Sequence, residues 1–252
     1  LTTEDLTNLL QLSDFEVVKS DVSTLLPAPV PLVAMFANRV APHLPVLRKA
    51  ALVNWLVARP SPRPVPVDEL SVSVVVAARN ESGNIADIVD RVPAMGRDTE
   101  LIFVEGGSSD DTYARIQREV AAQRRPDLTV KGLRQSGSGK GDAVREGFSQ
   151  AKGDVLMILD ADATVAPEDL PQFLEVLASE KAEFVNGSRL VYPMDDEAMR
   201  FLNMIGNKFF ARIFSYLLGQ PLKDTLCGTK VFRAGDYARI MRGRSYFGDF
   251  DP

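Results

Sequence analysis

The sequence is short of cysteine, of histidine and of long apolar runs. Cys227 is the only cysteine among 252 residues, which excludes an internal disulfide, and no cysteine–histidine spacing suits zinc. We therefore expect a reducing, cytosolic setting. His43 is the only histidine, so a site built from later residues has no histidine base. No window of eighteen uncharged apolar residues occurs and no signal peptide opens the chain, so we expect no membrane-spanning helix.

An excess of positive charge is also missing. The formal net charge is -5 at pH 7, and because a phosphate backbone requires a basic face, nucleic acid is not expected as a partner. A small anionic substrate remains compatible, since a few local cations or one metal ion are enough for it. The chain starts at Leu1 and stops at Pro252 within an aromatic, acidic run, and we interpret it as a fragment.

Prolines alternate with other residues at 60, 62, 64 and 66. This spacing favours an extended linker and excludes a helix. We therefore expect a small appendage over residues 1–60, a linker over 61–70, and a larger domain over 71–252 that is truncated at its C-terminal end.

The appendage shows a helix pattern from Thr3 to Leu12, a strand-like segment from Phe15 to Val18, and an apolar, helix-like stretch ending at Trp55. So small a unit rarely sustains its own core. The pattern resembles the tail of class I methyltransferases, whose glycine loop would lie upstream, and the appendage contains no methyl-donor site.

From Ser71 onward the sequence alternates between strand and helix patterns, which is typical of a parallel α/β sheet. Apolar runs predict strands, and helical spacing of apolar residues predicts helices after the first, second and fourth of them. Ligands bind beyond the carboxyl ends of the strands in such sheets, so the loops after the strands are the candidates for chemistry. The predicted strands are 72–77, 101–104, 128–133 and 155–159.

Two carboxylates, Asp160 and Asp162, follow the fourth predicted strand directly. At this spacing both can face one cation, and their hard oxygens suit Mg²⁺ or Mn²⁺. An isolated Asp-x-Asp is more often a solvated turn or a helix cap. Here the pair follows a hydrophobic strand and precedes a helix opened by Pro167, which favours a metal site.

Acidic residues and glycines also follow the first two predicted strands. The first ends in Ala77-Ala78-Arg79-Asn80-Glu81, which places charge where a ligand would lie. The second ends in Glu105-Gly106-Gly107, where glycines allow close approach of a nucleotide and Glu105 is able to accept hydrogen bonds from a base or ribose. A turn with an Asp110 or Asp111 helix cap accounts for the glycines equally well, but not for Glu105.

In this order the motifs resemble glycosyltransferase family 2, in particular the dolichyl- or polyprenyl-phosphate hexose synthases. The resemblance covers Ser71 to Ala234 and includes Gly139-Lys140-Gly141 as well as Asp160-Ala161-Asp162. It implies a glycosyltransferase-A type fold: a Rossmann-like, mostly parallel α/β sheet flanked by helices, with the small N-terminal appendage.

The sequence departs from the family pattern in three loops. Ala77 and Arg79 stand where family members have proline and tyrosine, and Glu105-Gly106 replaces a pair of aspartates, which leaves the base specificity open. Thr164 stands where a glutamine often assists the metal.

Two further segments match the family, Gly187-Ser188-Arg189 and Asp224 to Lys230. The resemblance implies that Arg189 and Lys230 lie near donor or acceptor phosphates, where cations stabilise charge. Each is equally able to be a solvated surface base. We take Asp162, Arg189, Lys230 and Asp224 as candidate catalytic residues. The candidate donor-binding residues are Ala77, Arg79, Glu81, Glu105, Gly107, Lys140, Asp160, Ala161, Asp162 and Arg189.

The resemblance implies inverting transfer of a hexose from a nucleotide-sugar, with Mg²⁺ or Mn²⁺, onto an acceptor such as a polyprenyl phosphate of the cell envelope. An ionised phosphate needs no strong base. A hydroxyl acceptor would need one, for which Asp224, Asp249 and Asp251 are the candidates. A non-catalytic module that binds nucleotide-sugars is the alternative from another class.

The segment from Ala198 to Leu222 is acid-free and amphipathic. Its basic residues and apolar stripe suit a helix in the interface of an anionic bilayer. The resemblance favours this interpretation, because the lipid-phosphate members of the family carry amphipathic helices in this region, and it implies a cytoplasmic protein at the inner face of the membrane. Packing on the sheet or on a second subunit is the alternative. The stripe contains Phe201, Ile205, Phe209, Ile213 and Leu217, and the basic residues are Arg200, Lys208 and Arg212.

Overall fold

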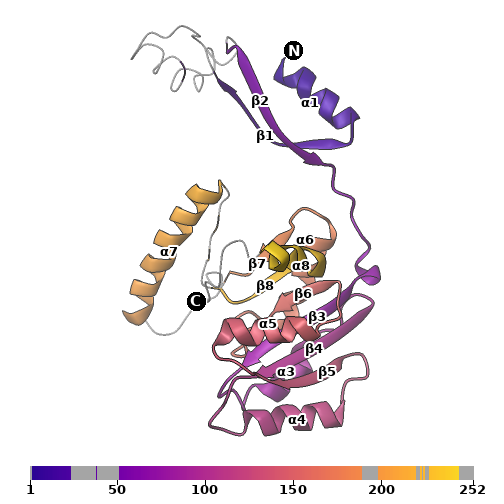
Figure 1. Ribbon diagram of the computed structural model, residues 1–252, viewed down its shortest axis with the longest axis vertical. Helices are drawn as coiled ribbons and strands as arrows, with labels where there is room; N and C mark the ends of the chain where they lie inside the picture. Colours follow the sequence, from indigo (N-terminus) through magenta and orange to yellow (C-terminus); the bar gives the residue numbers. More distant parts are fainter. Residues whose placement is uncertain are drawn as a thin grey trace. The chain divides into compact units, whose positions relative to one another are not determined.

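The computed structural model describes residues 2–23, 38, 51–188, 198–219, 222, 224 and 227–243. The chain divides into two compact units, Leu1–Arg63 and Pro64–Pro252, and the division falls within the segment of alternating prolines (Figure 1). Each unit is described by itself.

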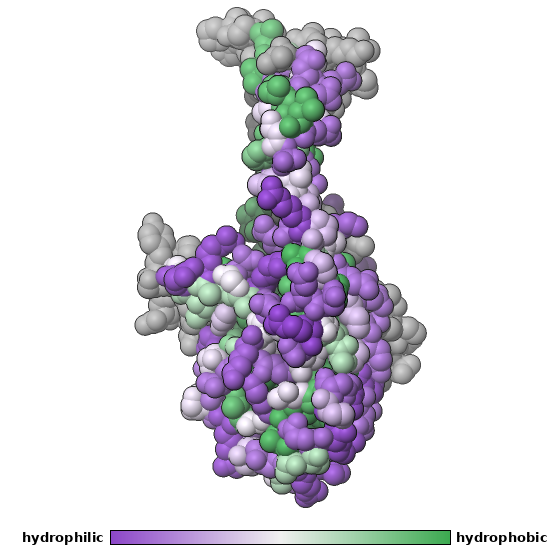
Figure 2. Space-filling view, turned by 90° about the vertical axis from the view of Figure 1, so that its right-hand side faces the viewer, coloured by the Kyte–Doolittle hydropathy of each residue, from purple (hydrophilic) through white to green (hydrophobic). Residues whose placement is uncertain are grey.

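The first unit is a helix on a two-stranded antiparallel sheet. Helix α1 (Thr3–Leu12) begins with a capping box, in which the Thr2 hydroxyl accepts from Asp5 N at 3.1 Å and the Asp5 carboxylate accepts from Thr2 N at 2.8 Å. Strand β1 (Phe15–Ser23) pairs with β2 (Val53–Pro60). Apolar side chains remain exposed on this unit (Figure 2), among them Leu12 and Val18.

Trp55 lies in strand β2, so the expectation of a helix ending at this residue is wrong there. Val53, Trp55 and Val57 alternate with more buried residues along the strand. This period of two, together with β-branched and aromatic side chains, favours a pleated strand over a helix. Residues 39–50, where most of the helix-like stretch lies, are outside the described residues.

The second unit contains a mixed six-stranded sheet in the order β5-β4-β3-β6-β8-β7. The first four strands in this order are parallel, and β8 runs antiparallel to both β6 and β7. The mostly parallel α/β sheet predicted from the sequence is confirmed. The strands are β3 (Ser71–Ala78), β4 (Asp98–Glu105), β5 (Thr129–Arg134), β6 (Val155–Ile158), β7 (Phe184–Asn186) and β8 (Lys230–Arg233).

Helices connect and flank these strands (Figure 1). Pro167 opens a short 3-10 turn that leads into α6, as proline suits the first turn of a helix. The elements are η3 (Val67–Glu69), α3 (Ile85–Arg91), α4 (Thr112–Ala122), α5 (Lys140–Gln150), η4 (Pro167–Asp169), α6 (Leu170–Ala178), α7 (Ala198–Leu218) and α8 (Ala234–Gly243).

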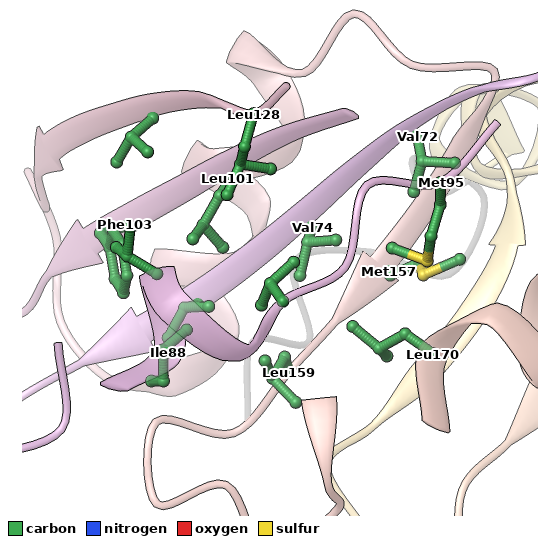
Figure 3. Packing of buried hydrophobic residues seen from close by; sticks show 14 of the residues in the cluster. Val72, Val74, Ile88, Met95, Leu101, Phe103, Leu128, Met157, Leu159 and Leu170 are labelled. Atoms are coloured by element: carbon green, nitrogen blue, oxygen red, sulfur yellow. The ribbon is translucent and has the colours of Figure 1, made fainter. Parts of the chain in front are cut away.

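The sheet is buried on both faces, which explains the unbroken apolar run of β3. Val72, Val74 and Val76 join a large core with α3, α4 and α6, in which Ile88 and Leu170 meet the strands (Figure 3). Val75 points to the opposite face, where α5 contributes Ala143, Val144 and Phe148. Side chains alternate between the two faces of a strand, so both sets must be apolar.

The larger unit begins structurally at Pro64. Val65 N donates to Ala178 O at 2.9 Å, and Val65 and Val67 pack against the large core. We predict that removal of residues 1–63 leaves the folding of the second unit and its ligand binding unchanged. Removal of residues 1–67 should lower the free energy of unfolding by about 1–3 kcal/mol through lost valine burial.

Chemical denaturation followed by circular dichroism measures the difference between the two truncated chains. Equal stability of both would contradict the placement of Val65 and Val67. A folded chain of residues 64–252 that had lost the ligand binding of the intact chain would contradict the independence of the second unit.

Candidate functional site

Three parallel strands end at the same edge of the sheet. Ala78 of β3 lies opposite Glu105 of β4, and Val75 of β3 lies opposite Ile158 of β6. A cavity of about 380 Å³ opens at this edge. It brings together seven of the residues singled out in the sequence, namely Ala77, Arg79, Glu81, Lys140, Asp160, Ala161 and Asp162.

The two aspartates sit on a tight turn after β6. Asp160 O accepts from Ala163 N at 3.0 Å, and Asp162 Oδ1 accepts from Thr164 N at 3.0 Å. Ala163 has a φ of 51°, a left-handed conformation that is uncommon for residues other than glycine and clusters at functional sites. The turn therefore holds both carboxylates at the cavity by a strained backbone.

The Asp160 carboxylate is packed against backbone from a distant segment. A Cβ atom placed on Gly228 would overlap both of its oxygens, so a side chain at this position would force the carboxylate to move. The other partner of Asp160 is the Lys140 ammonium, which forms a direct ion pair with Oδ1. Chain segments at 140, 160 and 228 thus meet at one carboxylate.

Lys230 lies close behind this carboxylate at the start of β8. Its ammonium donates to Asn186 Oδ1 at 2.7 Å and to Cys227 O at 2.9 Å. Burial lowers the pKa of Lys230, while the negative charges of Asp224 and Asp160 act in the opposite direction. Lys230 therefore adds a partly buried positive charge, held by two hydrogen bonds, whose field reaches Asp160.

Asp224 is buried, with 1 % of its surface exposed. Its Oδ1 accepts from Cys227 N at 3.1 Å, so the carboxylate anchors the backbone next to Gly228. Among the described residues, Asp224 and Lys230 do not belong to the cavity lining. Arg189, Asp249 and Asp251 lie outside the described residues.

Glu105 and Gly107 serve the loop rather than the cavity. Glu105 is 4 % exposed, its Oε1 accepts from Ser108 N, and its Oε2 lies 3.8 Å from Arg134 Nε. Gly107 has a φ of 70°, which the turn requires. Neither is among the described residues that line the cavity, and Gly106 lines it instead.

Sequence reasoning missed Gln135 and Gly228. Gln135 follows β5, lines the cavity, and its Nε2 donates to Gly139 O at 2.8 Å and Asp142 Oδ2 at 3.0 Å. The rule that ligands bind beyond strand ends applies to Gln135 as it does to Asp160. Gly228 lies in the segment 224–230 that matches the family, but its contact with Asp160 is visible only in the folded chain.

The first two loops are cross-linked by side-chain hydrogen bonds. Asn80, with a φ of 57°, accepts through Oδ1 from Ser109 N at 2.8 Å, and Glu81 N donates to Thr112 Oγ1 at 2.9 Å. Asp110 accepts from Thr112 N at 3.0 Å, and its pKa is lowered to about 2 chiefly by the Thr112 hydroxyl. These hydrogen bonds therefore hold the two loops of the cavity wall together.

The donor set suits a hard divalent cation. Asp160 and Asp162 offer carboxylate oxygens at the cavity, and the described residues contain no group of three or more His, Cys, Asp and Glu able to enclose a metal. A site of this kind leaves ligand positions to water and phosphate oxygens, which is the manner in which Mg²⁺ binds with phosphate substrates. The residues present therefore fit such a cation.

Residues 73–243 match Glycosyl transferase family 2, and the chain belongs to this family. Glycosyltransferase AglJ of Haloferax volcanii is 33% identical over 179 residues, which cover 71% of this chain and 55% of that protein. The undecaprenyl-phosphate 4-deoxy-4-formamido-L-arabinose transferase of Edwardsiella ictaluri is 38% identical over 167 residues, 65% of this chain and 49% of that protein. The chain thus spans about half the length of these relatives.

Among solved structures, glucosyl-3-phosphoglycerate synthase of Mycobacterium tuberculosis, in complex with Mn²⁺, UDP-glucose and phosphoglyceric acid, superimposes with a TM-score of 0.51. The identity is 21%, and the match covers 66% of this chain and 57% of that one. This likeness shows a shared fold. The family and the glycosyltransferase-A type fold expected from the sequence are confirmed.

The packing of the Asp160 carboxylate against Gly228 can be tested. We predict that Gly228→Ala displaces the Asp160 carboxylate and lowers kcat/KM for glycosyl transfer about 100-fold, because small misplacements in a site are costly. Release of nucleoside diphosphate measures the rate. Gly235→Ala is the matched control, since a Cβ there meets nothing within 4 Å. Wild-type activity of Gly228→Ala would show that close packing of Asp160 against Gly228 is not needed for activity.

Proposed function

We propose that this chain is the donor-binding part of a metal-dependent, inverting hexosyltransferase that uses a nucleotide-sugar and acts on a polyprenyl phosphate. The observation that carries the proposal is the cavity in which Asp160 and Asp162 face Lys140 and Arg79. Acids for a metal and cations for phosphates lie within one space at the carboxyl ends of parallel strands.

The residues of the cavity suit the parts of a nucleotide-sugar. Asp160 and Asp162 would hold Mg²⁺ or Mn²⁺, which supplies positive charge to the leaving diphosphate. Lys140 is the first residue of α5, so its ammonium and the helix N-terminus both favour phosphate oxygens. Arg79, Glu81 and Gln135 line the remaining wall of the cavity, where the nucleoside would bind.

The proposed reaction is a single displacement. An oxygen of the acceptor attacks the anomeric carbon, the bond between that carbon and the diphosphate oxygen breaks, and the nucleoside diphosphate leaves with the electron pair. Lys230, held beside Asp160, adds a fixed positive charge on this side of the site, and electrostatic stabilisation of a leaving group is a large catalytic contribution. Arg189 is proposed to contribute in the same way.

An anionic acceptor is favoured by the lack of histidine after residue 43 and by the burial of Asp224. No histidine follows His43, and Asp224 is buried, with its Oδ1 accepting from Cys227 N. An ionised phosphate oxygen attacks without proton removal, whereas a hydroxyl group requires a base. The name of the Edwardsiella ictaluri relative, an undecaprenyl-phosphate transferase, supports the same acceptor class.

A lipid-linked acceptor would bring the protein to the surface of a membrane, at its inner, cytoplasmic face. In the described part of the chain no helix is long and apolar enough to cross a bilayer. Helix α7 instead exposes a set of apolar side chains beside Lys208 and Arg212, a composition that suits an interfacial helix on anionic lipid. The exposed apolar residues are Phe209, Phe210, Ile213, Phe214, Leu217 and Leu218. Arg200, Phe201 and Ile205 have side chains outside the described part.

The metal assignment predicts that Asp160→Asn and Asp162→Asn each remove Mn²⁺-dependent donor binding and leave the fold intact. Each change keeps the shape of the side chain and removes an anionic ligand. Isothermal titration with a panel of nucleotide-sugars, with and without Mn²⁺, measures the affinity and also identifies the base. Asp68→Asn, at an exposed position without a recorded partner, is the control.

Unchanged donor and metal affinity in both aspartate variants would refute the metal site. Tight donor binding by the wild type of a full-length chain without any release of nucleoside diphosphate would favour the non-catalytic binding module over the transferase.

The membrane assignment predicts that replacing Phe209 and Phe214 with serine releases the protein from anionic vesicles without lowering donor affinity. Both rings are exposed, by 60% and 42%, and their burial among acyl chains supplies binding energy. Co-sedimentation with phosphatidylglycerol vesicles measures the effect, and Val176→Ser on α6, 39% exposed, is the matched control. Equal sedimentation of wild type and double variant would favour packing of α7 on protein.

A further inference from the structure

Lys140 and Asp160 form the closest contact between opposite charges in the cavity. The Lys140 ammonium pairs directly with Asp160 Oδ1. The Lys140 side chain is 55% exposed, whereas that of Asp160 is 13% exposed. The two partners therefore differ in freedom: a long side chain reaches from solvent onto an almost buried carboxylate.

Asp160 has little room to move. Its carboxylate fills the space over Gly228, and its backbone oxygen accepts from Ala163 N at 3.0 Å in the turn. Lys140, in contrast, opens α5 directly after Gly139, which has a φ of 82°, and its four-carbon stem has several rotamers. If this ion pair breaks, the side chain that moves to a new partner is therefore that of Lys140.

A cation on Asp160 and Asp162 competes with the Lys140 ammonium for the same carboxylate. Two positive charges at ion-pair distance from one carboxylate repel one another. Lys230 increases the repulsion, because it lies near Asp160 and is tied to Asn186 Oδ1 and Cys227 O. Lys140 must leave Asp160 when the metal binds, and it then needs another anion.

The diphosphate of the donor is the anion that fits, because Lys140 and the first turn of α5 border the cavity. We propose that Lys140 exchanges Asp160 for the donor diphosphate and thereby couples metal binding to donor binding. The inference rests on the proposed function, since the donor class comes from there. Lys140 thus acts as a positioning residue that makes the metal and the nucleotide bind as a pair.

The coupling is thermodynamic and therefore reciprocal. A nucleoside diphosphate that draws Lys140 away raises the affinity for Mn²⁺, and Mn²⁺ raises the affinity for the nucleotide by the same factor. Couplings between two sites are commonly about 5- to 150-fold. Removal of the ammonium should strengthen Mn²⁺ binding without nucleotide and at the same time reduce the coupling.

The test measures Mn²⁺ affinity from the free-ion electron paramagnetic resonance signal, with and without UDP or GDP. For the wild type we expect weak Mn²⁺ binding that tightens at least about fivefold with the nucleotide that binds. For Lys140→Met we expect tighter Mn²⁺ binding than wild type without nucleotide, and a nucleotide effect on Mn²⁺ affinity that is smaller than in the wild type. Lys140→Arg should keep the wild-type coupling, because it keeps the positive charge.

Lys181→Met is the matched control, since Lys181 is exposed and outside the residues recorded as lining the cavity, and it changes the net charge by the same amount. Mn²⁺ binding by Lys140→Met that is no tighter than wild type, or coupling equal to wild type, overturns the inference. Failure of the wild type to bind any nucleoside diphosphate would instead overturn the proposed function. Comparison of Lys140→Arg with wild type decides the question should the methionine variant not fold.

Discussion

The position of one carboxylate, that of Asp160, determines the arrangement of the site. It follows β6, lies over the backbone of Gly228 before β8, and pairs with Lys140 at the start of α5. Three segments separated by 20 residues or more in sequence are thus held to one another by a charge that burial makes costly unless it is paired. The sheet brings the segments to the same edge, and the carboxylate sets the distances between them.

The fold was largely predictable, because strands of a sheet that is buried on both faces have unbroken apolar runs in the sequence. Val72 to Ala77 is such a run, and the strand extends by one residue at each end. The short antiparallel strands β7 and β8 were not predicted. Each has only three or four residues with polar members such as Asn186 and Lys230, so no periodicity distinguishes them from a loop.

The site was predictable where a residue's position follows from the order and direction of the strands. The aspartates after β6 and the residues after β3 were found because parallel strands deliver their following loops to one edge. Glu105 follows the same rule, but its side chain turns back to Ser108 N, a choice made by local hydrogen bonding that sequence spacing does not encode. The role of Gly228 depends on a long-range contact, and Arg189 lies outside the described residues.

The left-handed alanine in the aspartate turn has a consequence for the entropy of binding. A non-glycine residue at a φ of 51° costs about 1–2 kcal/mol relative to ordinary backbone, and the surrounding structure offsets this cost when the chain folds. Glycine would relax the strain, yet it would also admit many more backbone conformations. With alanine at this position, the turn therefore loses its conformational freedom when the chain folds. A ligand that binds Asp162 then does not bear the entropy cost of ordering the loop.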